Sequence, residues 1–222
     1  MKFAILVFPG SNCDHDAYKV IDSIEGAYPS FVWHKNDDLS QFDCIIVPGG
    51  FSYGDYLRAG AIAKFSPIMK SLVLEANKGK KIIGICNGFQ ILLESGLLEG
   101  ALINNKKVKF RSKNVSLNTN NYNTPFTNAI PKNIEMVMPI AHRQGNYIAS
   151  KDVLKKLEDN NQIAFTYSPL KGGNPNGSCL DVAGIFNDKK NVLGMMPHPE
   201  RASDLILGSE DGLHIFKSML EG

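Results

Sequence analysis

The chain has 222 residues, of which 43% are hydrophobic, and a formal net charge of +2 at pH 7. This length is typical of one domain with a substantial core, and we expect residues 1–222 to form a single domain. Lysine and arginine are spread along the chain, which argues against a nucleic acid or a charged membrane as partner. Because no signal peptide and no apolar run of membrane-spanning length is visible, we expect a cytoplasmic protein with reduced cysteines.

Strands and helices alternate in the first half of the chain. The nearly continuous apolar run Lys2–Phe8 predicts a parallel strand buried on both faces, and further strands are predicted at Phe31–Trp33, Phe42–Val47 and Lys81–Ile85. Start signals and helical periodicity predict helices from Ser11 to about Ile24 and from Leu57 to about Ala76. This order predicts a doubly wound α/β fold, with a mostly parallel, flavodoxin-like sheet and helices on both of its faces.

The second half is more polar, and its segments are shorter. Alternating residues at Val108–Phe110 and Ile134–Met138 predict half-exposed strands, which we expect to extend the main sheet in antiparallel fashion. The other expected elements are two strands and two helices, at Ile163–Tyr167, Val182–Phe186, Val153–Leu157 and Leu213–Leu220. A turn-rich polar loop is expected at 118–123.

One cysteine stands where a strand is expected to turn into a helix. Cys86 is flanked two positions away on each side by Gly84 and Gly88, the layout of a nucleophile elbow with cysteine in place of serine. The positive end of the following helix favours a thiolate. A buried structural cysteine at a tight turn is the alternative interpretation of this motif alone.

A second motif supplies the groups that a nucleophilic thiol needs. His198 and Glu200 are two residues apart, so an extended segment places them on one side, and Pro197 and Pro199 stiffen the backbone between them. A thiol, a base and an acceptor that orients the base are the parts of a catalytic triad. A surface loop rich in proline would be the commoner meaning of this motif by itself.

The two motifs together, Gly84–Gln90 and His198–Glu200, resemble those of the class I glutamine amidotransferases. The resemblance implies a triad with Cys86 as nucleophile, His198 as base and Glu200 as the orienting group. The reaction it implies is hydrolysis of L-glutamine to glutamate and ammonia through a thioester.

Two further segments narrow the resemblance. Pro9–Asp14 and Pro48–Gly60 resemble the glutaminase subunits of phosphoribosylformylglycinamidine synthase, in their small, free-standing form. The partners this implies are a large ATP-using synthase subunit, which receives the ammonia in de novo purine biosynthesis, and a small accessory subunit. The sequence has no P-loop and no kinase-like signature, so we expect no cofactor or metal in this chain and place ATP and magnesium in the partner.

Ligands of open α/β sheets bind beyond the carboxyl ends of the strands, which is where these motifs lie. Acyl transfer needs hydrogen-bond donors for the developing oxyanion, and we expect the amide of Asn87 and one from Gly50 or Phe51 to supply them. The resemblance implies that Gln90 contacts glutamine. It also implies His-Gly-Glu-Gly where this chain has His142-Arg143-Gln144-Gly145, yet we still expect His142 to face the glutamine pocket.

Several residues and functions stay open at this stage. Cys13 lies near the site but has no elbow, and we assign it no role; Tyr53–Arg58 could serve an interface or the substrate. One alternative function is a glutaminase of another synthase, such as that for pyridoxal phosphate, against which Phe51–Asp55 argues. The other is a flavodoxin-like binding module with an inert or redox-sensing cysteine, against which the intact triad argues.

Overall fold

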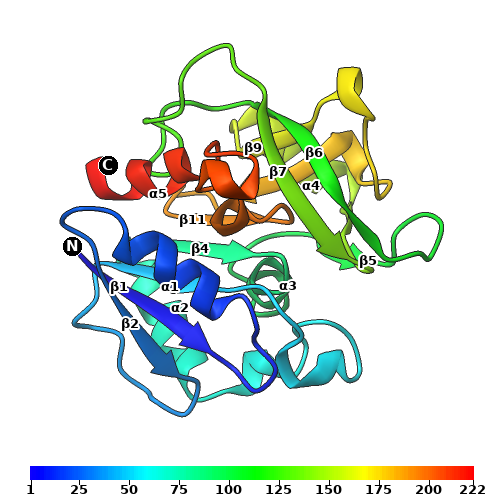
Figure 1. Cartoon of the computed structure of the whole chain (residues 1–222). Coiled ribbons are helices and arrows are strands. Elements are labelled where there is room, and N and C mark those ends of the chain that lie inside the picture. The colour runs from blue at the N-terminus through cyan, green and yellow to red at the C-terminus, as the bar shows by residue number, and fades with distance from the viewer.

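The computed structural model describes the backbone of residues 1–222 and every side chain except that of Lys171. Its centre is a nine-stranded sheet in the order β2-β1-β3-β4-β11-β10-β9-β6-β7 (Figure 1). These strands are β1 (Lys2–Val7), β2 (Tyr28–Trp33), β3 (Cys44–Val47), β4 (Lys81–Ile85), β6 (Arg111–Thr119), β7 (Met136–His142), β9 (Ile163–Tyr167), β10 (Val182–Phe186) and β11 (Val192–Met195). A separate antiparallel pair joins β5 (Ala101–Ile103) to β8 (Asn146–Ile148).

The sheet has a parallel part and an antiparallel part. Strands β2, β1, β3, β4 and β11 run parallel, whereas β10, β9, β6 and β7 are joined by antiparallel pairings. The fold class and the antiparallel extension predicted from the sequence are therefore confirmed. The pairing of β4 with β11 places Gly84 beside Gly194, which lies 110 positions further along the chain (194 − 84). It brings the ends of two distant segments to one edge of the sheet.

The helices are α1 (Asp14–Asp22), α2 (Ile68–Asn77), α3 (Asn87–Glu94), α4 (Lys151–Asp159) and α5 (Leu213–Glu221). In Figure 1, α1 lies in front of the parallel strands, and α2 and α3 lie behind them. Apolar side chains from the strands fill the space between these layers, since β3 is buried at all four of its positions and β4 at four of its five. None of the described helices is long and apolar enough to cross a membrane.

The helix predicted from Leu57 begins only at Ile68. Pro67 holds Ser66 in an extended conformation, with ψ 143°, and so separates α2 from a short turn at Ala63–Phe65. Residues before that turn lie against α3 instead, because the backbone of Gly60 approaches that of Gln90 closely. Periodicity alone cannot show such a break, since the apolar positions continue through it.

Two other boundaries differ from the prediction. Ser11 does not cap α1; its hydroxyl accepts the amide of Phe8, and the helix begins at Asp14. The strand predicted at Val108–Phe110 is wrong, because β6 begins at Arg111 and runs through residues 118 and 119, where a loop was expected. Pairing with β7 and β9 decides these limits, and neither partner is visible in the local pattern.

Candidate active site

The turn from β4 into α3 has the geometry of a nucleophile elbow. Cys86 joins them with φ 51° and ψ −103°, a conformation that non-glycine residues rarely adopt and that costs about 1–3 kcal/mol. A Cβ atom on Gly88 would lie 1.8 Å from the carbonyl oxygen of Val47, and one on Gly84 would lie 2.8 Å from the backbone of Gly88. Glycine is thus required at both flanking positions, because the helix packs directly on the strands.

The histidine motif follows the neighbouring strand. His198 lies three residues beyond β11, and its amide donates a hydrogen bond of 2.9 Å to the carbonyl of Pro139. Its Nδ1 lies 2.6 Å from Oε1 of Glu200, and both side chains are buried. Because β11 runs parallel beside β4, His198 is brought near Cys86, and the sulfur of Cys86 helps to raise the pKa of the imidazole. The structure therefore assembles the three predicted residues into one group, with the acceptor behind the base.

Electrostatics favour a charged imidazole in this group. Burial alone disfavours the imidazolium, but the carboxylate of Glu200 and the sulfur of Cys86 outweigh it and hold the pKa of His198 well above its usual range. Among the described residues, neither Nε2 of His198 nor Oε2 of Glu200 has a hydrogen-bond partner. The ring can thus take a proton from the thiol and keep it for the leaving group.

A second cysteine, to which we assigned no role from its sequence motif, lies against the triad. The sulfur of Cys13 is within 4.8 Å of a ring nitrogen of His198 and of a carboxylate oxygen of Glu200, and it accepts a hydrogen bond of 3.2 Å from Arg201. Burial raises the pKa of Cys13, against the lowering effects of His198 and Arg201. Its place in the loop after β1, at the edge where the other motifs gather, was the signal that could have identified it.

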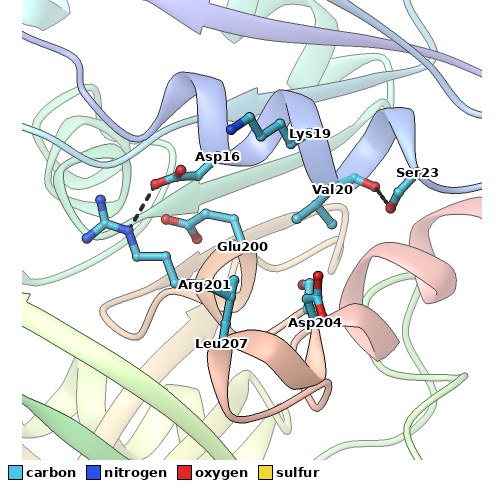
Figure 2. A pocket seen from close by; sticks show the side chains of 9 residues that line it. Asp16, Lys19, Val20, Ser23, Glu200, Arg201, Asp204 and Leu207 are labelled. Atoms are coloured by element: carbon cyan, nitrogen blue, oxygen red, sulfur yellow. Dashed lines mark hydrogen bonds and ion pairs between the residues drawn. The ribbon is translucent and has the colours of Figure 1, made fainter.

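Thiol, imidazole and carboxylate are all zinc ligands, so Cys13, His198 and Glu200 together have the composition of a metal site. The guanidinium of Arg201 donates a hydrogen bond to the sulfur of Cys13 and also pairs with Asp16 at 3.1 Å, so a positive charge already lies beside this group. Figure 2 shows this pair beside Glu200. Arg201 thus holds the sulfur of Cys13 beside the imidazole and carboxylate of the triad.

Figure 2 shows a pocket that Glu200 and Arg201 line. It has a volume of about 530 Å³ and lies between α1 and the segment that follows Pro199. Glu200, Arg201 and Asp16 line it, but Cys86 does not. Cys86 instead lines a smaller pocket of about 310 Å³, together with Gln90 and His142.

The predicted oxyanion donors lie at the edge of this smaller pocket. Gly50 and Phe51 line it, and Asn87 is the first residue of the helix after the nucleophile. The amide of Phe51 already donates to the carbonyl of Gly10 at 3.0 Å, so it is engaged in this conformation. No hydrogen bond from the amides of Gly50 or Asn87 is found among the described residues. Of the two loop candidates, Gly50 is therefore the one with an amide to offer.

The side chain of Asn87 has a function that the sequence did not predict. Its Oδ1 accepts the amide of Ser52 at 3.0 Å, and its Nδ2 donates to Oδ1 of Asp55 at 3.2 Å and to Oε1 of Gln90 at 2.8 Å. The loop after β3 is thus fastened to the first turn of α3. Gln90 lines the pocket as expected, while its amide also donates to the carbonyl of Gln144 at 2.7 Å.

His142 lines the same pocket from the end of β7. It is buried, and among the described residues its two ring nitrogens have no hydrogen-bond partner. Burial, together with the charge of His198, lowers the pKa of His142 to about 4, so the ring is neutral at physiological pH. Gly145 is needed behind it, because a Cβ there would lie 2.2 Å from the imidazole. A neutral, unpartnered imidazole beside the nucleophile is suited to contact a polar ligand.

Fold and site define a glutamine amidotransferase. Residues 1–212 match the family of CobB/CobQ-like glutamine amidotransferase domains, and the chain belongs to that family. It is similar to a chain in the structure of PurLQS from Thermotoga maritima, with 45% identity, a TM-score of 0.90 and coverage of 99% of this chain and 97% of that one. A glutamine amidotransferase from Thermotoga maritima has the same fold at 15% identity, with a TM-score of 0.62 over 100% of this chain and 96% of that chain.

Proposed function

We propose that this chain is the glutaminase subunit of a phosphoribosylformylglycinamidine synthase and supplies ammonia from L-glutamine. The observation that carries this proposal is the Cys86–His198–Glu200 group in a chain of the amidotransferase family. Its 45% identity to a chain of PurLQS, over nearly the whole length, supports the choice of synthase. The Pro48–Gly60 segment, whose resemblance led to that choice, forms one side of the glutamine pocket.

The geometry suggests how the residues divide the reaction. The sulfur of Cys86 attacks the side-chain amide carbon of glutamine, and the imidazole of His198 takes the thiol proton. The backbone amides of Gly50 and of Asn87, the first residue of α3, stabilise the oxyanion, and each such donor contributes roughly 10²–10³ in rate. The carbon–nitrogen bond then breaks, and the proton on His198 goes to the leaving nitrogen as ammonia is released. Water, activated by the same imidazole, hydrolyses the thioester to glutamate.

We further propose that the ammonia passes to an ATP-using synthase subunit with its own magnesium, and that a small accessory subunit completes the complex. The exposed aromatic and aliphatic side chains of Phe51, Tyr56 and Leu57 beside the pocket support docking at this face. Arg58 is less suited to a partner than the sequence indicated, because Glu94 binds its guanidinium through both carboxylate oxygens. We also propose a cytoplasmic location, where thiols stay reduced; all four cysteines are free.

The test separates the two halves of the reaction. We expect Cys86→Ala and Cys86→Ser to abolish synthesis from glutamine in the assembled complex while synthesis from added ammonia continues. The measurement is formylglycinamidine ribonucleotide formed with each nitrogen source. Substantial synthesis from glutamine in either variant would show that Cys86 is not the nucleophile. A complex that makes no amidine from ammonia either would show that the chosen synthase is wrong.

A further inference from the structure

One carboxylate in the glutamine pocket has no role in the chemistry described above. Asp55 lines the pocket together with Cys86 and Gln90, at the end of the short turn Ser52–Asp55. Its backbone has φ 53°, and Tyr53 in the same turn also has φ 53°. Left-handed conformations of non-glycine residues persist where the surroundings enforce them, and they are concentrated at functional sites. The fold thus holds this side chain in the pocket at the cost of backbone strain.

The contacts of Asp55 position it without neutralising it. Asn87 donates to Oδ1 at 3.2 Å and ties it to the helix that begins behind the nucleophile. No ion pair of Asp55 with a lysine or arginine is found among the described side chains, and the guanidinium nearest in sequence, Arg58, is bound by Glu94. A carboxylate can accept about four hydrogen bonds, so most of its capacity is unused.

The surroundings make the unpaired carboxylate unfavourable in the empty pocket. Burial raises the pKa of Asp55 to about 6, against the lowering effect of the Asn87 hydrogen bond. The group is therefore still mainly ionised at pH 7, partly removed from water and supported by one amide. A cation that enters the pocket would restore the lost solvation and be bound for that reason. None of the other described residues that line the pocket carries a carboxylate, so Asp55 is the acidic side chain that a cation would meet there.

We propose that Asp55 binds the α-ammonium group of the substrate and so determines that the enzyme accepts an amino acid rather than any primary amide. This inference rests on the proposed glutaminase function. With the ammonium at Asp55, the side-chain amide extends toward Cys86, which lines the same pocket. A pocket of about 310 Å³ is at the small end for ligand sites and suits a single amino acid. Asp55 acts on binding and orientation, not on bond breaking.

The experiment compares L-glutamine with 4-carbamoylbutanoate, which lacks only the α-amino group. We expect Asp55→Asn to raise KM for L-glutamine about 10–100-fold with kcat changed by less than a few-fold, the range for a hydrogen bond to a charged group. The substitution keeps an oxygen for Asn87, so the loop stays fastened. KM for 4-carbamoylbutanoate should change little, and the variant should lose most of the preference for the amino acid. Asp188→Asn, which alters an exposed carboxylate that binds Lys156, is the matched control.

Binding measured without turnover separates this inference from the proposed function. In a Cys86→Ala background, calorimetry should show L-glutamine bound 10–100-fold more weakly when Asp55 is also Asn, with no such difference for 4-carbamoylbutanoate. That result supports the ammonium contact even if the synthase assignment fails. Equal weakening of both ligands would mean that Asp55 only maintains the loop and would overturn the inference. An unchanged Kd for L-glutamine would overturn it too, as would the absence of L-glutamine binding to the Cys86→Ala variant that retains Asp55. Asp55→Glu, which keeps the charge, should recover more affinity than Asp55→Asn.

Discussion

At the scale of single residues, the site depends on burial. His198 and Glu200 are both enclosed, so their 2.6 Å contact is shielded from water and fixes which ring nitrogen faces the nucleophile. The imidazolium is stabilised by Glu200 and by the sulfur of Cys86, and Cys13 contacts the same ring. Cysteine at position 13 thus belongs to the packing that holds the base, although we did not assign it a role from its motif.

The first residue-scale prediction concerns the base. We expect His198→Asn to slow acylation by roughly 10²–10⁴, the usual contribution of a general base, and Glu200→Gln to slow it less, because it leaves the imidazole in place. The measurement is the rate at which an electrophilic glutamine analogue labels Cys86. Equal labelling rates in wild type and His198→Asn would rule out activation of the thiol by His198.

The second residue-scale prediction concerns the neighbouring sulfur. Cys13→Ser should leave one labelled cysteine per chain, at Cys86, and should retain hydrolysis, because the thiol of Cys13 supports His198 without touching the substrate pocket. Mass spectrometry of the labelled protein locates the modified residue. Label found on Cys13 in the wild-type chain, or hydrolysis abolished by Cys13→Ser while Cys86→Ser stays active, would exchange the roles of the two cysteines.

At the scale of elements, the elbow exists because α3 packs without any gap on β3 and β4. The carbonyl of Val47 occupies the position that a side chain on Gly88 would need. The loop after β3 is in turn attached to this helix through Asn87, which contacts Ser52 and Asp55. Strand, helix and loop therefore form one packed unit around the nucleophile, and we expect a substitution in any one of them to shift the positions of the other two.

This packing predicts the cost of a single methyl group. Gly88→Ala should lower the free energy of unfolding by about 2–3 kcal/mol or more, in the upper range for overpacking, because its neighbour is backbone and cannot rotate away. Urea denaturation measures the loss. Gly26→Ala is the control: its φ of +82° costs about 1–2 kcal/mol of left-handed strain, but nothing lies within 4 Å of the added carbon. A smaller loss at position 88 than at position 26 would contradict this account of the elbow.

At the scale of the whole molecule, two of the parallel strands of the sheet, β4 and β11, position the triad, while residues from its antiparallel part also line the pocket. His142 at the end of β7 and Arg143 just beyond it come from this second part. The oxyanion loop lies at the exposed side, next to the apolar residues that we propose contact the synthase. A partner bound there would touch the loop that must present the amide of Gly50.

We therefore predict that the isolated chain is a poor glutaminase and that its partner activates it. In the free chain the amide of Phe51 ties this loop to the carbonyl of Gly10, and docking of the partner would orient the neighbouring amide of Gly50 toward the oxyanion, where one donor contributes roughly 10²–10³ in rate. Glutamate formation is measured for the chain alone and for the complex with its nucleotide and acceptor. Full activity of the chain alone would mean that the loop is already in its active conformation.

The sequence by itself determined the features that depend on local chemistry. The elbow at Gly84–Gly88, the His198–Glu200 motif and the order of strands and helices were all readable, because glycine spacing and apolar runs report backbone geometry directly. The strands Lys81–Ile85, Ile163–Tyr167 and Val182–Phe186 were predicted with the bounds that the structure has. The fold and the activity were predicted from the family resemblance, and the match of residues 1–212 to the family confirms that resemblance.

Only the tertiary structure decided which residues meet. The contact of Cys13 with His198 joins residues 185 positions apart (198 − 13), and no local pattern encodes such a pairing. The start of α2, the limits of β6 and the tie of Asn87 to the loop depend likewise on neighbours supplied by distant segments. The burial that shifts the pKa values of Asp55 and His142 is a property of the assembled pocket. Solvation of a side chain depends on everything packed around it, and the sequence of one segment cannot specify that.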